Sequence, residues 1–388
     1  MTGMLHSANA PTPLHDFSLK TRLLFGHRSA DRVGELAREY GAQKVLLVTD
    51  AGVTQAGHAA RVEQTLRAAG LHVTVFNQVR ENPTVTDVAL CSQAAREAQP
   101  DCFIGLGGGS VLDVTKAANL LLTNGGEIKD FCGSNKVAHP LRPWIAIPTT
   151  TGTGSECQSS LILVDESARC KLICRDPKLI APTALLDPTL ASSQPPRVTA
   201  ATGMNAIAQA VESAVSRKRN PLAQLFAREA FRLCYGNLLK TMTFPDDLEA
   251  RGQMLLGATY AGLAAECGGL GAAHAAAYPL ETNCNVLHGV ATGVMLSAVI
   301  RFNAQQALAR SIYTDLARLA MLDTPEALSE ALERLLADAK LPRSLSACGV
   351  PHKMIPGLTD EAVKQWAVPF NPRPVNTSDF SKLYNAVF

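Results

Sequence analysis

A run of glycines between an apolar segment and a helical one is the first feature of this sequence that could do chemistry. Residues 105–110, GLGGGS, follow the apolar stretch DCFI and precede a segment with helical spacing that begins near Val111. Glycine lets an anion approach the backbone closely, and the start of a helix presents free N–H groups and a positive dipole end. The pattern predicts a phosphate-binding loop, although it is neither GxGxxG nor a Walker loop. An ordinary glycine-rich turn is the alternative.

Two further segments could meet the same ligand. The segment IPTTTGTGSE, residues 147–156, follows a buried apolar stretch and offers uncharged hydroxyl donors that suit a pyrophosphate or a nicotinamide carboxamide. Asp50 ends the apolar run KVLLVTD. A carboxylate at that place can accept hydrogen bonds from ribose hydroxyls and would repel a 2′-phosphate, which favours NAD over NADP. The alternatives are an ordinary Ser/Thr loop and a turn residue.

These segments belong to a chain in which expected strands and helices alternate. Strands are expected at 17–26, 44–50, 71–79, 101–107 and 143–150, and segments with helical spacing separate them. Such alternation predicts a mainly parallel sheet covered by helices on both faces. Ligands bind such sheets at the carboxyl ends of the strands, where the glycines, hydroxyls and Asp50 lie. Residues 159–166, 170–176 and 183–188 predict additional short strands, which could form a hairpin.

The pattern changes near the two prolines at 195 and 196. Beyond them strand signals disappear, and helical spacing continues to the end of the chain. We therefore predict a lead segment over residues 1–16, an α/β dinucleotide-binding domain over 17–194 and an all-helical domain over 195–388.

Composition excludes several classes of protein. The 388 residues carry a net charge of +2, which argues against a nucleic-acid binder, and 47% are apolar, which argues against disorder. No uncharged window of about 18 apolar residues occurs, so no membrane partner is expected. The start of the chain lacks a secretory pattern, and the ten cysteines form no CxxC pair. We expect a cytoplasmic protein with reduced cysteines.

Five long segments occur in the order GGGSVLDVTKA, IPTTTGTGSE, LLDPTL, TAATGMNAIAQAVES and GLGAAHAAAYPLETNCNVLHG. Together they resemble the iron-containing (group III) alcohol dehydrogenases, and the resemblance runs from about residue 18 to the C-terminus. It implies a Rossmann-like parallel sheet that binds a dinucleotide, followed by an all-α domain, which is also the dehydroquinate synthase-like fold. It further implies a divalent metal and a small alcohol or carbonyl substrate in the cleft between the domains, and a homodimer.

The resemblance assigns the cofactor NAD(H) to particular side chains. Lys171 is placed at the ribose and phosphate, although a solvated lysine on an edge strand is the alternative, and Leu190 is placed against the cofactor. Asp113 is expected to help hold the nicotinamide side. The remaining positions line the pyrophosphate (Gly107, Gly108, Gly109 and Ser110) or the nicotinamide and phosphate region (Thr149, Thr150 and Ser155).

The metal site is where this sequence departs from the family. The family uses one Asp and three His, whereas the corresponding residues here are Asn205, Gln209, His274 and His288. A further family histidine is Tyr278 here. Amide oxygens are neutral, whereas Fe²⁺ and Zn²⁺ prefer imidazole, carboxylate or thiolate. We therefore expect metal binding to be weak or absent, and His274, His288 and Tyr278 to serve as the catalytic groups at the substrate oxygen.

These features predict an NAD(H)-dependent oxidoreductase that interconverts a small alcohol and its aldehyde or ketone. One alternative is a metal-independent reductase of an oxo acid, because the maleylacetate reductases also carry Asn at the position of Asn205. Another is a non-catalytic dinucleotide-binding relative. The basic residues Arg197, Arg217, Lys218 and Arg219 are candidates for binding an anionic substrate, although a solvated helix end is the alternative for the run SRKRN. The role of Glu212 stays open between support of the site and a plain helix face.

Overall fold

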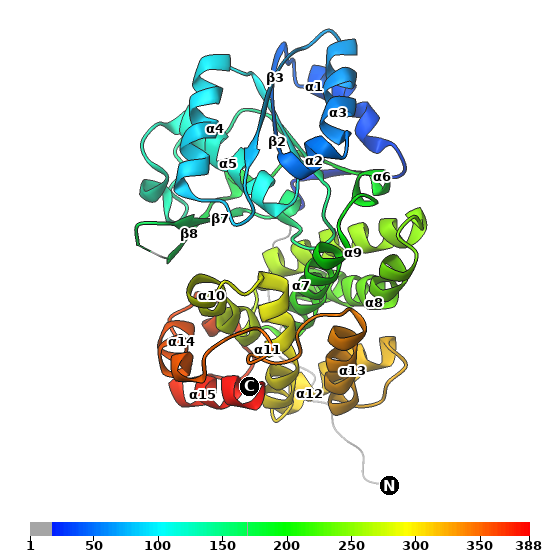
Figure 1. The fold of residues 1–388 in the computed structure, drawn as a ribbon, viewed down its shortest axis with the longest axis vertical. Coiled ribbons are helices and arrows are strands. Elements are labelled where there is room, and N and C mark those ends of the chain that lie inside the picture. Colours follow the sequence, from blue (N-terminus) through cyan, green and yellow to red (C-terminus); the bar gives the residue numbers. More distant parts are fainter. Residues whose placement is uncertain (1–17, 169) are drawn as a thin grey trace, which may run out of the picture.

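The computed structural model describes residues 18–168 and 170–388, so the predicted lead segment 1–16 lies outside the described residues. A six-stranded sheet in which every neighbouring pair is parallel forms the middle of the N-terminal half (Figure 1). In spatial order the strands are β1 (Arg22–Phe25), β9 (Thr183–Leu186), β6 (Trp144–Pro148), β4 (Cys102–Gly107), β2 (Lys44–Asp50) and β3 (His72–Val79).

Helices cover both faces of this sheet. Val45 and Leu47 of β2 pack on one face and Leu46 and Val48 on the other, because successive strand side chains point to opposite faces. Both faces are therefore apolar, as expected for a parallel sheet buried on both sides. One face is covered by α1 (Val33–Glu39), α2 (Ala51–Gln55), α3 (His58–Ala68) and α6 (Pro188–Ala191), the other by α4 (Val85–Ala98) and α5 (Gly109–Asn124).

A small second sheet projects from this half towards the helical half. The strands β7 (Ser160–Asp165) and β8 (Cys170–Arg175) form an antiparallel hairpin, and β5 (Gly133–Ser134) lies parallel to β8. The expected strand at 183–188 is β9, which joins the main sheet. β8 lies beside α10 (Ala272–Cys284), as Figure 1 shows, so the hairpin forms part of the wall between the two halves.

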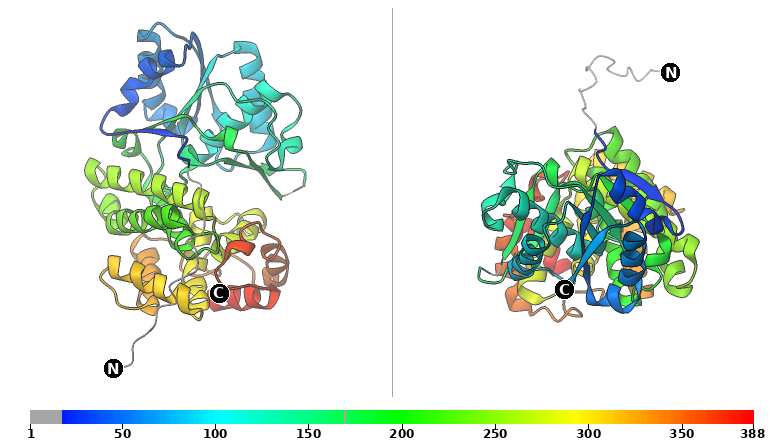
Figure 2. Two further views of the ribbon diagram at one scale, coloured as in Figure 1. Left: turned by 180° about the vertical axis from the view of Figure 1, so that it is seen from behind. Right: turned by 90° about the horizontal axis from the view of Figure 1, so that it is seen from above.

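The rest of the chain is helical and has a hydrophobic core of its own (Figure 2). Its central helix, α7, is buried along most of its length, as the small apolar side chains between Ala200 and Val215 allow. No helix in the described part of the chain is both long and apolar enough to cross a membrane. The helices are α7 (Pro196–Val215), α8 (Pro221–Thr243), α9 (Leu248–Gly268), α10, α11 (His288–Asn303), α12 (Ala307–Leu319), α13 (Pro325–Asp338), α14 (Ile355–Ala362) and α15 (Thr377–Ala386).

The predicted fold class, a parallel α/β half followed by an all-helical half, is confirmed. Among the described residues the last strand ends at Leu186, and helices follow from Pro188 onward. The domain boundary between residues 194 and 195 stays a prediction.

Candidate active site

The glycine loop joins the fourth strand of the chain to the longest helix of the sheet domain. β4 ends at Gly107, and α5 begins at Gly109 without a side-chain cap from any described residue, so its first N–H groups are left for another acceptor. A Cβ on Gly109 would lie 2.7 Å from Cγ2 of Thr153, and one on Gly108 would lie 3.0 Å from Cγ2 of Thr150. Only glycine lets the loop approach the segment 147–156 so closely.

A cavity of about 670 Å³ opens at this loop, within the range that holds small-molecule ligands. Asp50 lies on its wall, where Oδ1 accepts a hydrogen bond from the N–H of Val53, 2.8 Å away, at the start of α2. The second carboxylate oxygen is thus left for a ligand. The predicted cofactor residues on this wall are Asp50, Gly108, Gly109, Ser110, Thr149 and Thr150.

Five other predicted cofactor residues lie elsewhere. Gly107 faces Val111, and a Cβ there would lie 2.5 Å from Cγ2 of that residue. Leu190 is fully buried in the core on one face of the sheet and does not line the cavity. Asp113, Ser155 and Lys171 line a second, smaller cavity of about 170 Å³.

The two cavities adjoin one another. Ser110, Thr153, Asn205 and His288 belong to the walls of both. A ligand in the larger cavity would therefore reach the edge of the smaller one, the arrangement that hydride transfer between two bound molecules requires.

Asp113 has a mainly structural setting. Its Oδ1 accepts from the hydroxyl of Ser155 at 2.7 Å and its Oδ2 from the N–H of Ile162 at 2.9 Å. The fully buried Lys116 lies 3.6 Å away and donates to Ser155 and to the carbonyl of Ser160. Burial raises the pKa of Asp113 and lowers that of Lys116. The hydrogen bonds of Lys116 thus connect α5 to the segment 147–156 and to β7. The sequence analysis did not identify Lys116, although it lies one helical turn after Asp113.

Three polar side chains follow one face of the central helix α7. Asn205, Gln209 and Glu212 are spaced by four and three residues, which places them on the same side of the helix. The amide nitrogens of Asn205 and Gln209 donate to the carbonyls of Gly152 and Thr153, each at 3.2 Å. Their oxygens, Oδ1 and Oε1, are buried without a hydrogen-bond partner among the described residues.

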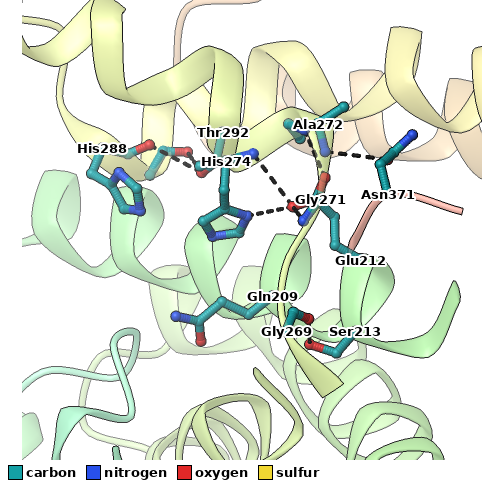
Figure 3. A network of polar contacts seen from close by, with 12 residues as sticks. Gln209, Glu212, Ser213, Gly269, Gly271, Ala272, His274, His288, Thr292 and Asn371 are labelled. Atoms are coloured by element: carbon teal, nitrogen blue, oxygen red, sulfur yellow. Dashed lines mark hydrogen bonds and ion pairs between the residues drawn. The ribbon is translucent and has the colours of Figure 1, made fainter. Parts of the chain in front are cut away.

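Glu212 supports the N-terminus of α10 and the imidazole of His274 (Figure 3). Its carboxylate accepts from the N–H groups of Gly271 at 3.0 Å and Ala273 at 2.6 Å, and from Nδ1 of His274 at 2.6 Å. When Nδ1 donates to this carboxylate, Nε2 of a neutral imidazole is an acceptor, and Nε2 is buried with no partner in the described part of the chain. Glu212 therefore fixes the orientation and the tautomer of His274.

A second glutamate holds the other imidazole. Glu281 of α10 is bonded to Nδ1 of His288 through one oxygen and to the ammonium of Lys171 through the other. Burial acts to raise the pKa of Glu281, but His288 and Lys171 outweigh it and bring that pKa down to about 2. The carboxylate is thus ionised, so Nδ1 of His288 donates and Nε2 is left as an acceptor. Burial lowers the pKa of His288, against the opposing effect of Glu281.

The sequence reasoning missed Glu281 entirely. Its partner Lys171 is 110 positions away, so no local pattern signals the contact. The only available signal was a carboxylate in the segment between His274 and His288.

Tyr278 completes the wall of the smaller cavity. The centroid of its ring lies 5.7 Å from that of His288, and Nζ of Lys171 lies 5.3 Å from the ring centroid. The ring centroids of His274 and His288 are 5.4 Å apart. Burial raises the pKa of the Tyr278 phenol far above its usual range, so the hydroxyl stays protonated. The structure thus brings together all five residues predicted for metal binding and catalysis.

The larger cavity thus adjoins a smaller one that is lined by two imidazoles, and comparison with known proteins gives the family. The family model "iron-containing alcohol dehydrogenase" matches residues 20–188, and that for the C-terminal part of the Fe-containing alcohol dehydrogenase family matches residues 199–388. The chain therefore belongs to the iron-containing alcohol dehydrogenase family. The predictions of this family and of an oxidoreductase acting on CH–OH groups are confirmed.

Individual relatives match over nearly the whole chain. The NAD-dependent methanol dehydrogenase of Bacillus methanolicus is 30% identical over 374 residues, which cover 95% of this chain and 98% of that protein. The 1,3-propanediol dehydrogenase of Klebsiella pneumoniae is 31% identical over 384 residues, which cover 97% of this chain and 99% of that protein. A crystal structure of 1,3-propanediol oxidoreductase matches with a TM-score of 0.93 at 30% identity, covering 97% of this chain and all of that one.

The donor set does not fit the iron ion that the family name implies. The available atoms are Oδ1 of Asn205, Oε1 of Gln209 and one imidazole nitrogen each from His274 and His288, so none carries a negative charge. Hard or borderline divalent ions bind such a neutral set weakly. Among residues 18–168 and 170–388, no three His, Cys, Asp or Glu side chains gather as metal ligands. The two glutamates lie behind the imidazoles, and the ammonium of Lys171 adds a positive charge beside one of them.

Proposed function

We propose that this protein is an NAD(H)-dependent oxidoreductase that interconverts a small alcohol and its carbonyl compound, and that imidazole–glutamate pairs manage the proton at the substrate oxygen. The observation that carries this proposal is the position of His288. It belongs to the walls of both cavities, and its Nδ1 is bonded to an ionised glutamate.

The larger cavity fits the cofactor. The free N–H groups at the start of α5 and the hydroxyls of Thr149 and Thr150 suit a pyrophosphate, and the free oxygen of Asp50 suits a ribose. NAD(H), when bound, accepts or supplies the hydride at the substrate carbon. The charge of Asp50 favours NAD(H) over its 2′-phosphorylated form.

In the direction of oxidation, Nε2 of His288 accepts the proton of the alcohol as hydride leaves the carbon. The C=O bond forms from the electrons of the O–H bond, and the proton stays on the imidazole. Glu281 stabilises the imidazolium through Nδ1, as the carboxylate does in serine hydrolases. In reduction, hydride adds to the carbonyl carbon and the imidazolium of His288 donates this proton to the carbonyl oxygen.

The Tyr278 side chain supplies the donor that a carbonyl oxygen needs, because its phenol stays protonated. An alcohol has a single O–H, which donates to Nε2 of His288, so its oxygen can accept from the same phenol. Nε2 of His274 and the amide oxygens of Asn205 and Gln209 have no donor among the described residues, and the reacting hydroxyl cannot satisfy them while it donates to His288. The smaller cavity thus offers an acceptor for the alcohol and a donor for the carbonyl compound.

A single substitution tests this proposal. In His288→Gln we expect kcat/KM for NADH-dependent reduction of short aldehydes to fall about 10²- to 10⁴-fold. The affinity for NADH, measured by fluorescence titration, should change little. His139→Gln is the matched control, because His139 is exposed and lines neither cavity.

Two results would contradict the proposal. One is a wild-type protein that binds NADH but turns over no aldehyde or alcohol of a broad panel, which is the behaviour of a non-catalytic relative. The other is a His288→Gln variant that keeps the activity of the His139→Gln control.

A further inference from the structure

The smaller cavity also contains two unsatisfied hydrogen-bond donors, which the proposed proton chemistry does not use. Arg175 ends β8, and Trp366 follows α14. Both line the cavity, and the guanidinium carbon of Arg175 lies 4.5 Å from the centroid of the Trp366 ring. This distance is that of a cation–π contact, which leaves the N–H groups of both side chains free to donate to a ligand.

These donors have no partner within the protein as described. Nε of Arg175 and Nε1 of Trp366 are both buried, and neither donates to any residue in 18–168 or 170–388. Arg175 also forms no ion pair with a described carboxylate. A buried donor left unpaired is destabilising and rare, so two of them on one cavity wall indicate a ligand that accepts hydrogen bonds.

The carboxylates on the same wall are already engaged. Glu281 is bonded to Lys171 and His288, and Asp113 to Ser155 and Ile162. Glu266 accepts from the N–H and the hydroxyl of Ser159, at 3.1 and 2.6 Å.

The two cations of β8 therefore differ. Lys171 and Arg175 share one face of the strand, because side chains four residues apart along a strand point the same way. Lys171 is neutralised by Glu281, whereas the charge of Arg175 has no partner in the described chain. Arg175 is the positive charge of this cavity that is available to a ligand.

We infer that Arg175 and Trp366 bind an anionic group of the substrate, so that the substrate is a short hydroxy or oxo acid. This inference rests on the proposed function and specifies its substrate class. A guanidinium edge matches the two oxygens of a carboxylate, and a sulfonate or phosphonate offers the same acceptors. The anion lies on Arg175 and the indole N–H, while the alcohol or carbonyl carbon lies near His288 and the cofactor cavity.

The size of the cavity limits the chain length. Its volume of about 170 Å³ is close to that of a cavity of about 150 Å³ that holds benzene, a molecule with six non-hydrogen atoms. A three- or four-carbon oxo acid fills such a space. The basic residues that the sequence suggested for an anion, Arg197, Arg217, Lys218 and Arg219, do not line it.

The test compares a charged and an uncharged aldehyde of equal chain length. With wild-type protein and NADH, we expect kcat/KM for succinic semialdehyde to exceed that for butanal by about 10- to 100-fold, the usual range for a charge-assisted hydrogen-bonded contact. In Arg175→Gln the ratio of the two kcat/KM values should fall to near one, mainly through a higher KM for succinic semialdehyde. Arg96→Gln, at an exposed arginine of α4, is the control and should keep the advantage.

The outcomes separate the two proposals. If Arg175→Gln lowers the values for both aldehydes equally, or if wild-type protein shows no preference, the anion site is wrong while the oxidoreductase stands. If neither aldehyde is reduced although NADH binds, the proposed function itself fails. An aldehyde of the same carbon chain with a sulfonate in place of the carboxylate shows which anion is preferred. Loss of the advantage of either anionic aldehyde over butanal in Arg175→Gln supports the site.

A second measurement covers the case in which Arg175→Gln does not fold. Butanoate should inhibit butanal reduction by wild-type protein competitively with butanal, and butanamide should not. Equal inhibition by the acid and its amide would overturn the inference.

Discussion

The two imidazoles of the cleft are each bonded to a glutamate, but the two pairs have different surroundings. Glu212 also accepts from backbone N–H groups at the start of α10, and the His274 side chain is only 1% exposed. Glu281 instead bonds to the ammonium of Lys171, and the His288 side chain is 28% exposed at the junction of the two cavities.

This difference assigns the pairs different tasks. A carboxylate that satisfies several buried donors stabilises the fold and fixes one imidazole as an acceptor. A carboxylate that is paired with an ammonium and bonded to an accessible imidazole can stabilise the imidazolium that forms when the ring takes up a proton. We therefore expect changes at Glu212 to act mainly on stability, and changes at Glu281 to act on turnover as well as on stability.

Among the variants that separate the two pairs, Glu281→Gln should have the largest effect. An amide cannot stabilise the imidazolium of His288, so kcat/KM should fall about 10²- to 10³-fold. The affinity for NADH should be unchanged, and the pH profile of kcat/KM should shift. Glu330→Gln is a matched control, because Glu330 is exposed on α13 and its contact with Arg334 is 3.8 Å long. Equal activity of the two variants would remove the distinction between the pairs.

Glu212→Gln should act on stability instead. The side-chain amide group would face the N–H donors of α10, which leaves buried donors without an acceptor. We expect the free energy of unfolding, measured by urea denaturation, to fall by about 2–4 kcal/mol. A variant as stable as Glu330→Gln would show that the start of α10 does not depend on this carboxylate.

The pH dependence of stability tests whether Glu281 is held as a carboxylate in the folded protein. The pKa of Glu281 is lowered from 4.5 to about 2, so the folded state holds the charged form more strongly than the unfolded state does. Its contribution is present above pH 4.5 and is lost as the pH falls towards the folded pKa.

The measurement is the difference in unfolding free energy between wild type and Glu281→Gln. It should shrink by about 2–3 kcal/mol as the pH falls through this window. A constant difference for Glu281→Gln would mean that Glu281 is not held as a carboxylate by its partners.

The smallest effect concerns the cofactor half. Asp50→Asn keeps an acceptor for the N–H of Val53 and so preserves the start of α2, but it removes the negative charge. We expect the preference for NADH over NADPH, measured by fluorescence titration, to fall by about tenfold. An unchanged preference would show that the free oxygen of Asp50 does not meet the ribose.

The sequence predicted the fold and the glycine loop because both depend on local patterns. Strand periodicity, glycine runs and the hydroxyl segment are each contained within about ten residues. The catalytic half was only partly predictable. Asn205, Gln209, His274 and His288 were found through resemblance, whereas Glu281 and Arg175 depend on contacts between distant parts of the chain.

Lys171 illustrates the limit. The resemblance placed it at the ribose, whereas in the structure it lines the smaller cavity and bonds to Glu281, which is 110 positions away. No property of the segment RCKLIC indicates that partner. The sequence left the role of Glu212 open. Its role depends on the start of α10 lying against α7, which places the N–H groups of Gly271 and Ala273 at its carboxylate.

On our proposal, imidazole–glutamate pairs transfer the proton at the substrate oxygen without a resident metal. The most direct measurement is NADH-dependent turnover before and after exhaustive dialysis against a chelator, with the metal content of the same samples determined. We predict full turnover in protein freed of metal and no stimulation by Fe²⁺ or Zn²⁺. Turnover that disappears with the metal and returns when Fe²⁺ or Zn²⁺ is restored would contradict the account.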